Sequence, residues 1–331
     1  MKILITGAFG FVGTSLSAYL AGKGYELWAL DVESPLTETR RVQSVYQKCF
    51  DWKQLKKIPW SEVDAVIHLA GKAHDTRNTS EAKSYFDINV GLTEKVVQAW
   101  KKGFARADAE TKTQRKFILF SSVKAVADRV EDVLTEKAIP NPQTPYGQSK
   151  LKAEGVVRSA IGDRQSAVTS YILRSCMIHG PGNKGNLNLL YGVVKKGMPW
   201  PLGAFENQRS FMSIGNVCAV VEKLLTASVP AGVYQMADDE SVSTNELIGL
   251  ISEALGKKAR IWRIPSKWVR ASARIGDALR LPLNSERLKK LTESYIVSNA
   301  RIKGAFGWTA MPVSAREGLK ATLESFRQAR P

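Results

Sequence analysis

The sequence predicts an α/β fold, with a doubly wound parallel sheet and a smaller C-terminal α/β domain. Short, continuously apolar runs alternate with helix-like segments in the first half of the chain. This alternation is typical of βαβ units whose parallel strands are covered on both faces. A glycine-rich turn follows the first apolar run, and after Ser175 the alternation gives way to loops rich in Gly, Pro and Asn.

The apolar runs predict five buried strands, at residues 2–6, 26–30, 65–70, 116–122 and 169–175. Parallel strands need right-handed crossovers, and helical periodicity is present between several of the runs. We expect a first domain at residues 1–175, to which residues 211–236 return. Residues 176–331 are expected to form mainly the second, substrate-binding domain.

Helix-like segments are predicted from periodicity and capping signals. Ser243 or Thr244 is a suitable N-cap for one of them, and Pro312 and Ser314 open the last. The predicted helices are 13–21, 89–100, 149–158, 189–196, 243–255 and 311–330.

Composition is ordinary for a globular protein, with 44% hydrophobic and 24% charged residues. The net charge of +17 is large. A solvated basic surface is the simplest interpretation, and attraction of anionic ligands such as nucleotides or acidic lipid headgroups is the next. No motif supports nucleic acid as a partner, and no apolar run is long enough to span a membrane.

The cysteines and histidines bear on the cellular compartment of the protein and on whether it binds a metal. Cys49, Cys176 and Cys218 are few and widely spaced, which favours a reducing, cytoplasmic location. The N-terminus lacks the features of a signal peptide. Three histidines without ligand spacing predict no metal site.

A glycine loop follows the first strand, where residues 6–13 read TGAFGFVG. Gly7 suits a tight turn, Gly10 a close approach of the backbone to a pyrophosphate, and Gly13 the packing of helix on strand. The following helix offers free N–H groups to phosphate. A tight turn without a ligand is the alternative interpretation, but the context favours a Rossmann-type dinucleotide site. The intervening Phe9, Phe11 and Val12 are expected to contact the cofactor.

Asp31 ends the second strand, 18 residues after Gly13. A carboxylate at this place accepts hydrogen bonds from ribose hydroxyls and repels a 2′-phosphate, so NAD is the predicted cofactor. Arg40 and Arg41 follow soon afterwards and weaken the preference over NADP.

A candidate catalytic pair, Tyr146 and Lys150, lies four residues apart. On a helix both side chains share one face. Oxidation or reduction at a carbinol carbon also moves the hydroxyl proton, and a phenol whose pKa is lowered by a lysine can carry it. A surface helix with an amphipathic tyrosine is the alternative, which the upstream Ser121 and Ser122 make less favourable.

An ordered set of motifs extends along most of the chain. The motifs are TGxxGxxG at 6–13, HLAG at 68–71, FxxNV at 86–90, SS at 121–122, PYGQSK at 145–150, LR at 173–174, GPG at 180–182, RSF at 209–211 and FGWT at 306–309. With these motifs the chain resembles the extended short-chain dehydrogenase/reductase superfamily, in the branch of sugar-nucleotide epimerases, dehydratases and 4-keto reductases. SSVK, PGNKGN and LTESYIVSNARIKGAFGW look closest to enzymes of bacterial surface-polysaccharide assembly. Those enzymes reduce or epimerise C4 of UDP-N-acetylhexosamines.

The resemblance implies roles for individual residues. Tyr146 would be the acid/base, and Lys150 would orient the nicotinamide ribose and tune Tyr146. A Ser or Thr normally hydrogen-bonds the reacting hydroxyl, but Val123 stands at that place. Either Ser122 takes that role with a one-residue shift, or a group of the substrate or a water replaces it; we expect Ser122. The remaining cofactor-binding residues implied are Asp51 and Trp52 beside the adenine, Leu69, Ala70 and Gly71 along the cofactor, and Asn89 as a support.

For the substrate, the resemblance favours Asn186 and Leu187 in the loop that precedes a helix. Arg209 would bind the diphosphate, a role that suits a bidentate guanidinium, and Arg287 is a second candidate. From the residues alone, a polar connection without a ligand is the preferred interpretation of the loop at 180–188.

A basic segment spans residues 257–290, with 11 Lys and Arg against two acids and with Trp262 and Trp268 among them. A solvated helical face and weak docking on an acidic membrane both remain open.

The predicted function is a 4-keto reductase or a 4-epimerase. A 4,6-dehydratase is disfavoured because Val123 and Lys124 replace the carboxylates that it needs. A non-catalytic dinucleotide sensor and a reductase of non-nucleotide carbonyls stay as alternatives. The resemblance also implies a homodimer, which the sequence itself does not test.

Overall fold

The computed structural model describes residues 1–32, 45–73, 81–104, 114–161, 168–183, 185–279 and 284–328. Its main feature is a seven-stranded sheet in the order β10-β7-β5-β4-β1-β2-β3, in which all neighbouring strands are parallel. This confirms the predicted doubly wound α/β fold. The strands are β1 (Lys2–Thr6), β2 (Glu26–Asp31), β3 (Lys48–Asp51), β4 (Ala65–His68), β5 (Arg115–Ser122), β7 (Val168–Ser175) and β10 (Gly232–Met236).

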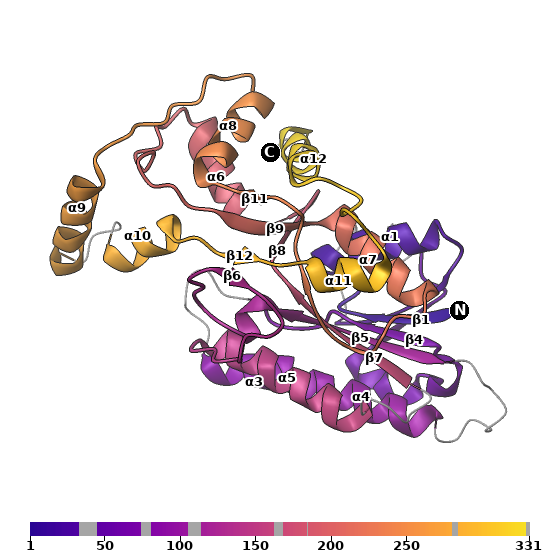
Figure 1. Ribbon diagram of the computed structural model, residues 1–331. Coiled ribbons are helices and arrows are strands. Elements are labelled where there is room, and N and C mark those ends of the chain that lie inside the picture. The colour runs from indigo at the N-terminus through magenta and orange to yellow at the C-terminus, as the bar shows by residue number, and fades with distance from the viewer. Residues whose placement is uncertain are drawn as a thin grey trace.

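Helices cover both faces of this sheet (Figure 1). One face carries α1 (Phe11–Ala21) and α7 (Ile214–Thr226), and the other carries α3 (Ala82–Asn89), α4 (Gly91–Phe104) and α5 (Pro145–Ile161). Short 3-10 turns complete this part, at η1 (Trp52–Lys57), η2 (Trp60–Glu62) and η3 (Val123–Ala125).

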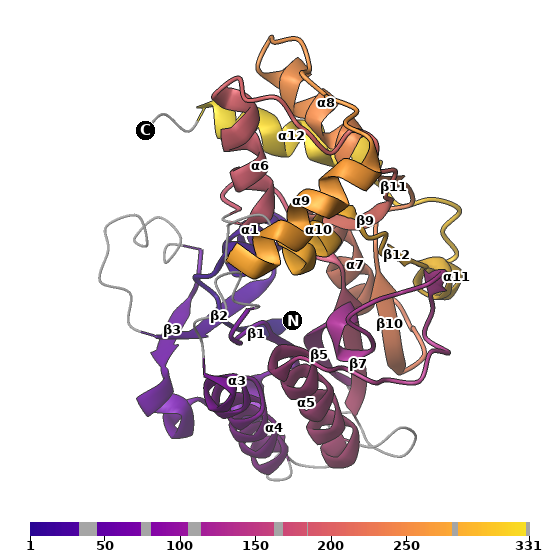
Figure 2. The same ribbon diagram turned by 90° about the vertical axis from the view of Figure 1, so that its left-hand side faces the viewer.

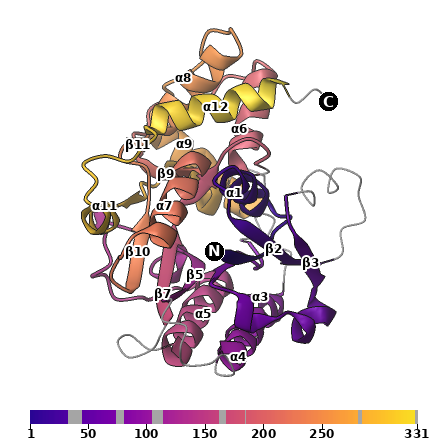
Figure 3. The ribbon, with the colours of Figure 1, turned by 90° about the vertical axis from the view of Figure 1, so that its right-hand side faces the viewer.

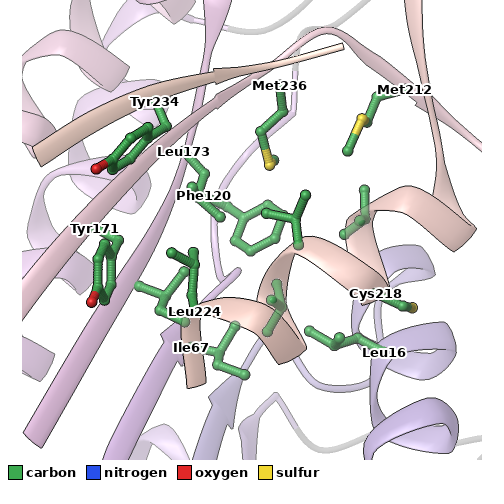
Figure 4. Close-up of a cluster of buried hydrophobic side chains, with 14 of the residues drawn as sticks. Leu16, Ile67, Phe120, Tyr171, Leu173, Met212, Cys218, Leu224, Tyr234 and Met236 are labelled. Carbon is green, nitrogen blue, oxygen red and sulfur yellow. The ribbon is translucent and has the colours of Figure 1, made fainter. Parts of the chain in front are cut away.

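Two hydrophobic cores hold the helices to the sheet. In the core beneath α1 and α7, Leu16 and Leu224 pack against Ile67 and Leu173 of the strands (Figure 4). In the core beneath α4 and α5, Trp100 packs against Phe117, with ring centroids 5.5 Å apart. Since full burial of one such side chain contributes about 1.5–3 kcal/mol, the two cores fix the strand edges that carry the site.

The smaller part lies above the carboxyl edge of the sheet (Figures 2 and 3). Its three-stranded sheet has the order β11-β9-β8, and a third core packs α6, α8, α9, α10 and α12 together. The elements are β8 (Met177–His179), α6 (Asn186–Lys195), β9 (Arg209–Ser213), β11 (Ser241–Val242), α8 (Thr244–Ala254), α9 (Ser266–Leu279), α10 (Ser285–Thr292) and α12 (Ala315–Gln328).

The chain passes between the two parts several times. After β9 it returns to build α7 and β10 on the large sheet. β6 (Val133–Leu134) pairs with β12 (Ile296–Val297), and α11 (Ala300–Phe306) packs beside β10. The domain limit at residue 175 stays a prediction.

Local expectations had mixed outcomes. The predicted helix at 89–100 is confirmed as α4, which begins at Gly91 after α3 ends at Asn89. β3 was not predicted, because its exposed Lys48 and Cys49 break the apolar run. Of the two suggested caps, Ser243 is the one used: its side chain accepts from the N–H of Glu246 in a capping box. In the described part of the chain, no helix is both long and apolar enough to cross a membrane.

Candidate active site

The glycine loop forms the turn between β1 and α1. Gly7 has φ +67°, and a Cβ there would lie 2.8 Å from the N of Ala70. A Cβ on Gly13 would lie 2.4 Å from the O of Gly7. Gly10 is the exposed N-cap of α1 and would meet only the O of Gly7, at 3.3 Å. Gly7 and Gly13 are thus needed for close packing, while Gly10 leaves a bare backbone at the helix N-terminus, which fits a pyrophosphate.

Asp31, the last residue of β2, lies beside this loop. Its Oδ2 accepts from the N–H of Phe9 at 2.8 Å, and its Oδ1 accepts from the N–H of Val32 at 2.7 Å. Asp51 is its register partner on β3, so both carboxylates stand at the same edge of the sheet. The Oδ1 of Asp51 caps η1 by accepting from the N–H groups of Lys53 and Gln54.

Several of the other residues predicted to contact the cofactor pack against a hydrophobic core. Trp52 is half-buried against the core beneath α4 and α5. Phe9 and Val12 pack on the opposite core, and the Phe9 ring meets that of Tyr46 edge-on. Phe11 reaches the substrate side, since a Cβ on Gly180 would lie 3.4 Å from its Cζ.

A buried network follows β4 and joins the loop at 69–72 to α3 and α5. His68 Nδ1 lies 2.7 Å from the Thr6 hydroxyl, which accepts from the N–H of Ala70. Burial, reinforced by the charge of Lys150, lowers the pKa of His68 to about 3, so the ring is neutral at pH 7. The next residue, Leu69, donates its N–H to the O of Thr6.

Asn89 is the support that the sequence predicts at the end of α3. Its Oδ1 accepts from the N–H of Lys72 at 2.7 Å, and its Nδ2 donates to the hydroxyl of Ser149 at 2.9 Å. Gly71 packs into the same corner: a Cβ there would lie 2.8 Å from Asn89 Oδ1 and 3.2 Å from Lys150 Nζ. The first turn of α5 is thereby fixed against the loop.

Tyr146 and Lys150 occupy successive turns of α5. Burial raises the pKa of Tyr146, and a hydrogen bond with the Ser122 side chain opposes that rise. Val123, in contrast, is a member of the core beneath α1 and α7. The structure thus brings Ser122, and not Val123, to the phenol.

Lys150 donates from Nζ to the main-chain O of Phe120 at 3.0 Å. Burial lowers its pKa to about 8, against the opposing charge of Glu154. Burial is the largest cause of the raised pKa of Tyr146, so the predicted lowering of that pKa by Lys150 stays a prediction. Tyr146 is therefore protonated at neutral pH.

Sequence reasoning missed the carboxylate behind this pair. Glu154, fully buried one turn after Lys150, accepts from the hydroxyl of Ser121 at 2.6 Å. It also accepts from Nε and Nη2 of Arg174, at 2.9 and 2.7 Å. The signal available was the recurrence Tyr146-x3-Lys150-x3-Glu154, which places all three on one helix face.

Arg209 begins β9 on the side of the smaller part. Its Nε donates to the O of Glu293 at 3.2 Å, and burial lowers its pKa. The half-buried Lys124 stands near it: its Nζ lies 4.0 Å from the ring centroid of Tyr295, and its pKa is lowered by burial and by Arg209. Carboxylates also lie close to these two cations: Asp128 and Glu293 oppose the lowering of the Lys124 pKa, and Glu293 opposes that of Arg209.

The other predicted substrate residues are placed differently. Asn186 is exposed on the first turn of α6. Leu187 is 1% exposed in the third core, so only its main chain is open to a ligand. The side chain of Arg287 lies outside the described residues, as do Arg40 and Arg41. Among the described residues, no group of three or more His, Cys, Asp or Glu is arranged to hold a metal ion.

A parallel sheet with a bare glycine loop at its carboxyl edge, next to a Tyr–Lys pair, defines the class of dinucleotide-dependent oxidoreductases. The chain belongs to the NAD dependent epimerase/dehydratase family, whose model matches residues 3–237. This membership confirms that the protein is an enzyme and that NAD is its cofactor, and the site described above fits that group.

Curated relatives agree along almost the whole chain. A UDP-glucose 4-epimerase of Vibrio cholerae is 27% identical over 99% of this chain and 96% of its own length. An N-acetyl-alpha-D-glucosaminyl-diphospho-ditrans,octacis-undecaprenol 4-epimerase of Escherichia coli O157:H7 is 25% identical, over 98% and 94%. A GDP-6-deoxy-D-mannose reductase of Pseudomonas aeruginosa is 26% identical, over 98% and 97%.

Solved structures share the fold. The UDP-glucuronic acid 4-epimerase of Bacillus cereus in complex with NAD aligns with a TM-score of 0.72, at 20% identity over 99% of both chains. The UDP-glucose 4-epimerase of Thermus thermophilus in complex with NAD aligns with a TM-score of 0.72, at 21% identity over 100% of both.

Proposed function

We propose that this enzyme oxidises or reduces C4 of a UDP-linked N-acetylhexosamine, as a 4-keto reductase or a 4-epimerase that supplies polysaccharide precursors. The observation that carries the proposal is the Ser122–Tyr146–Lys150 arrangement beside the glycine loop. The relatives named above act, by their names, as 4-epimerases or reductases of sugars on a diphosphate.

NAD, when bound, supplies the acceptor or donor of the hydride. The residues of the chain handle the proton and the orientation. Tyr146, protonated at neutral pH, donates its phenolic proton to the C4 oxygen during reduction and takes it back during oxidation. Ser122 holds the same oxygen through its hydroxyl, and so fixes the distance over which the proton moves.

Lys150 acts by position and charge. Its ammonium donates to the O of Phe120 here and would donate to the nicotinamide ribose in the loaded enzyme. Glu154 lies one turn behind, buried between Arg174 and Ser121, and favours the charged form of Lys150. Protonated Lys150 would in turn stabilise Tyr146 whenever it loses its proton.

We assign the rest of the cofactor site to the glycine loop and its neighbours. Gly10 and the N–H groups of Phe11, Val12 and Gly13 would bind the pyrophosphate, because they start α1. Gly7 and Phe9 shape the turn. The assigned adenosine contacts are Asp31, Asp51 and Trp52, and the assigned nicotinamide contacts are Leu69, Ala70, Gly71 and Asn89.

On the substrate side, Arg209 would bind the diphosphate and Asn186 the nucleotide, with Leu187 contributing its main chain only. Residues 1–175 with 211–236 would then hold the cofactor, and residues 176–331 mainly the substrate. A cytoplasmic location, a homodimer and a role for Arg287 stay predictions.

A second candidate substrate is the same aminosugar diphosphate on a polyprenol in place of uridine. The relative from E. coli O157:H7 acts, by its name, on such a lipid. The specific observation that favours it here is the exposure of Trp262 and Trp268 on the smaller part, at 57% and 71%.

The deciding experiment supplies a UDP-4-keto-6-deoxy-N-acetylhexosamine with NADH and follows the nicotinamide absorbance. Stoichiometric loss of NADH with a reduced sugar identifies a 4-keto reductase. Without that loss, the C4 epimer is sought from UDP-N-acetylhexosamine with NAD, and then from the polyprenyl diphosphate sugar.

Tyr146→Phe is the matched control, because it removes only the phenolic oxygen. It should lose at least about 100-fold in kcat while it binds NAD normally. Failure of all three substrates, or full activity of Tyr146→Phe, would show that the proposed chemistry is wrong, and the sensor alternative would then be preferred.

A further inference from the structure

One helix of the smaller part exposes large apolar side chains that belong to no core. Trp268 and Ile275 of α9 are 71% and 58% exposed, and Trp262 in the preceding loop is 57% exposed. We name this the α9 surface. It also includes seven exposed basic residues: Lys257, Lys258, Arg260, Arg263, Lys267, Arg270 and Arg274.

The geometry of α9 separates a buried face from an exposed apolar one. Val269 and Ala273, four residues apart, are buried in the third core. Trp268 and Ile275 are seven residues apart and therefore share another side of the helix. Helical spacing places Lys267 and Arg274 on the neighbouring side of the helix, so that apolar and cationic strips run in parallel. Arg270 points further round the helix, where its guanidinium lies 5.9 Å from the ring centroid of Phe205.

The charge of this segment is nearly all of one sign. Residues 257–277 contain the seven basic residues and a single acid, Asp277. That acid accepts from the N–H and the hydroxyl of Ser285, at 2.9 and 2.5 Å, and so links α9 to α10. The α9 surface is thus strongly cationic around its exposed tryptophans.

We infer that the α9 surface docks the enzyme on a lipid bilayer containing anionic phospholipids. Such a bilayer accepts both features at once, because its interface takes up Trp and Ile while its headgroups attract Lys and Arg. A second copy of this chain fits less well, since the whole chain carries +17 and two α9 surfaces would repel each other.

The position of α9 determines which edge of the large sheet would face the bilayer. In Figure 1 the N-terminus lies at the right beside β1, so the parallel strands run toward the left, where α9 and α10 lie. Figure 2 looks onto that side and shows both helices in front. Docking through α9 therefore turns the carboxyl edge of the sheet toward the bilayer.

The test is co-sedimentation with vesicles of phosphatidylcholine and phosphatidylglycerol in a two-to-one ratio, against vesicles of phosphatidylcholine alone. We expect binding to the mixed vesicles only, weakened by added salt. Lys267→Ser/Arg274→Ser should weaken the binding about 25-fold, at roughly fivefold for each charge near the surface. Trp268→Ser/Ile275→Ser should also weaken it, because the apolar insertion is lost.

The matched control is Lys101→Ser/Lys102→Ser, which removes the same charge from exposed positions at the end of α4. It should bind like the unaltered protein, and all variants should keep the same unfolding midpoint. Absence of binding to the mixed vesicles, or equal losses in the control, would overturn the inference. So would α9 variants that alter only self-association without vesicles, since the surface would then be an interface between copies.

Discussion

Ser122 and Val123 are adjacent residues whose side chains point to opposite sides of the end of β5. Ser122 meets the phenol of Tyr146 and also accepts from the N–H of Lys124, while Val123 fills the core beneath α1 and α7. The place where the strand ends and η3 begins decides which of the two reaches the substrate. Catalytic geometry at this point therefore depends on one residue of register.

Replacing each of these two residues separates their roles. Ser122→Ala should lower kcat about 100-fold or more, because the reacting oxygen loses a partner. Val123→Ala should keep kcat and lower the free energy of unfolding by about 2 kcal/mol, since it only removes core methyl groups. Steady-state kinetics and urea denaturation measure the two effects. Equal kcat losses in both variants would contradict the assignment of Ser122.

His68 supplies a second prediction at this scale. Its pKa is about 3 in the folded protein, against about 6.5 in an unfolded chain. Between these values the unfolded chain binds more protons, so folding stability falls as the pH drops from 6.5 toward 3. His68→Gln removes this dependence. From pH 7 to pH 5, the variant should lose about 2 kcal/mol less than the unaltered protein in urea denaturation.

Other titrating groups cancel in that comparison, because both proteins carry them. Parallel losses in the two proteins would mean that His68 is charged in the fold. The hydrogen bonds to Thr6 and Thr93 would then need another explanation than a neutral ring.

At the scale of elements, the glycines in the turn from β1 to α1 differ in whether a side chain would fit. Gly10→Ala meets only one neighbouring atom, at 3.3 Å, so the protein should fold with an almost unchanged Tm. The added methyl group stands at the N-terminus of α1, where we propose that the pyrophosphate binds, so NAD affinity should fall about tenfold or more. Isothermal titration calorimetry with NAD is the measurement.

Two other glycines calibrate this result. Gly91→Ala meets nothing within 4 Å at the start of α4, and should leave NAD affinity unchanged while raising stability by up to about 1 kcal/mol. Gly13→Ala would clash with main-chain atoms of Gly7 and Ala8 and should unfold at a lower temperature. Unchanged NAD affinity in Gly10→Ala would place the pyrophosphate elsewhere.

Most strands of the large sheet could be predicted from the sequence, but not all elements could. β1, β2, β4, β5 and β7 were predicted to within a few residues, because strands buried on both faces read as continuous apolar runs. The glycine loop and the Tyr–Lys pair were visible because their chemistry depends on local spacing. β3 was not predicted because it is a half-exposed edge strand, and α9 was not predicted because, among its described side chains, Val269 and Ala273 are the buried ones.

Contacts between distant residues could not be predicted in this way. Glu154 meets Ser121 and Arg174 only after three elements pack together, and the raised pKa of Tyr146 reflects a burial that no spacing encodes. Leu187 illustrates the reverse case: a motif suggested ligand contact, but tertiary packing placed its side chain in a core.

At the scale of the whole molecule, three consecutive acids after β10 fasten the C-terminal half to the large sheet. Asp238 accepts from the N–H of Ser213, Asp239 from the N–H of Met311, and Glu240 from the N–H of Ala315 at the start of α12. The acids thus connect β9, the segment before α12 and α12 itself. Since Arg209 lies on β9, this junction also helps to position the residue that we propose binds the diphosphate.

Asp238→Ala tests that coupling. Asp238 is 2% exposed, and its carboxylate accepts from Ser213 N at 3.0 Å and from Asn216 Nδ2 at 2.7 Å. Its loss takes this acceptor from the buried N–H of Ser213 and leaves Asn216 Nδ2 with the O of Val313. The free energy of unfolding should fall by about 4 kcal/mol. Glu324→Ala on the exposed side of α12 should change it by less than about 0.5 kcal/mol.

The shape of the unfolding transition tests the junction more directly than the unfolding midpoint does. In the unaltered protein, unfolding followed by tryptophan fluorescence and by far-UV circular dichroism should coincide, because both parts unfold as one unit. In Asp238→Ala the two signals should separate, with the smaller part unfolding first and NAD binding retained at that stage. A single coincident transition in the variant, or a loss below about 1 kcal/mol, would show that the large sheet and the smaller part are held together by their apolar contacts and not by the acids after β10.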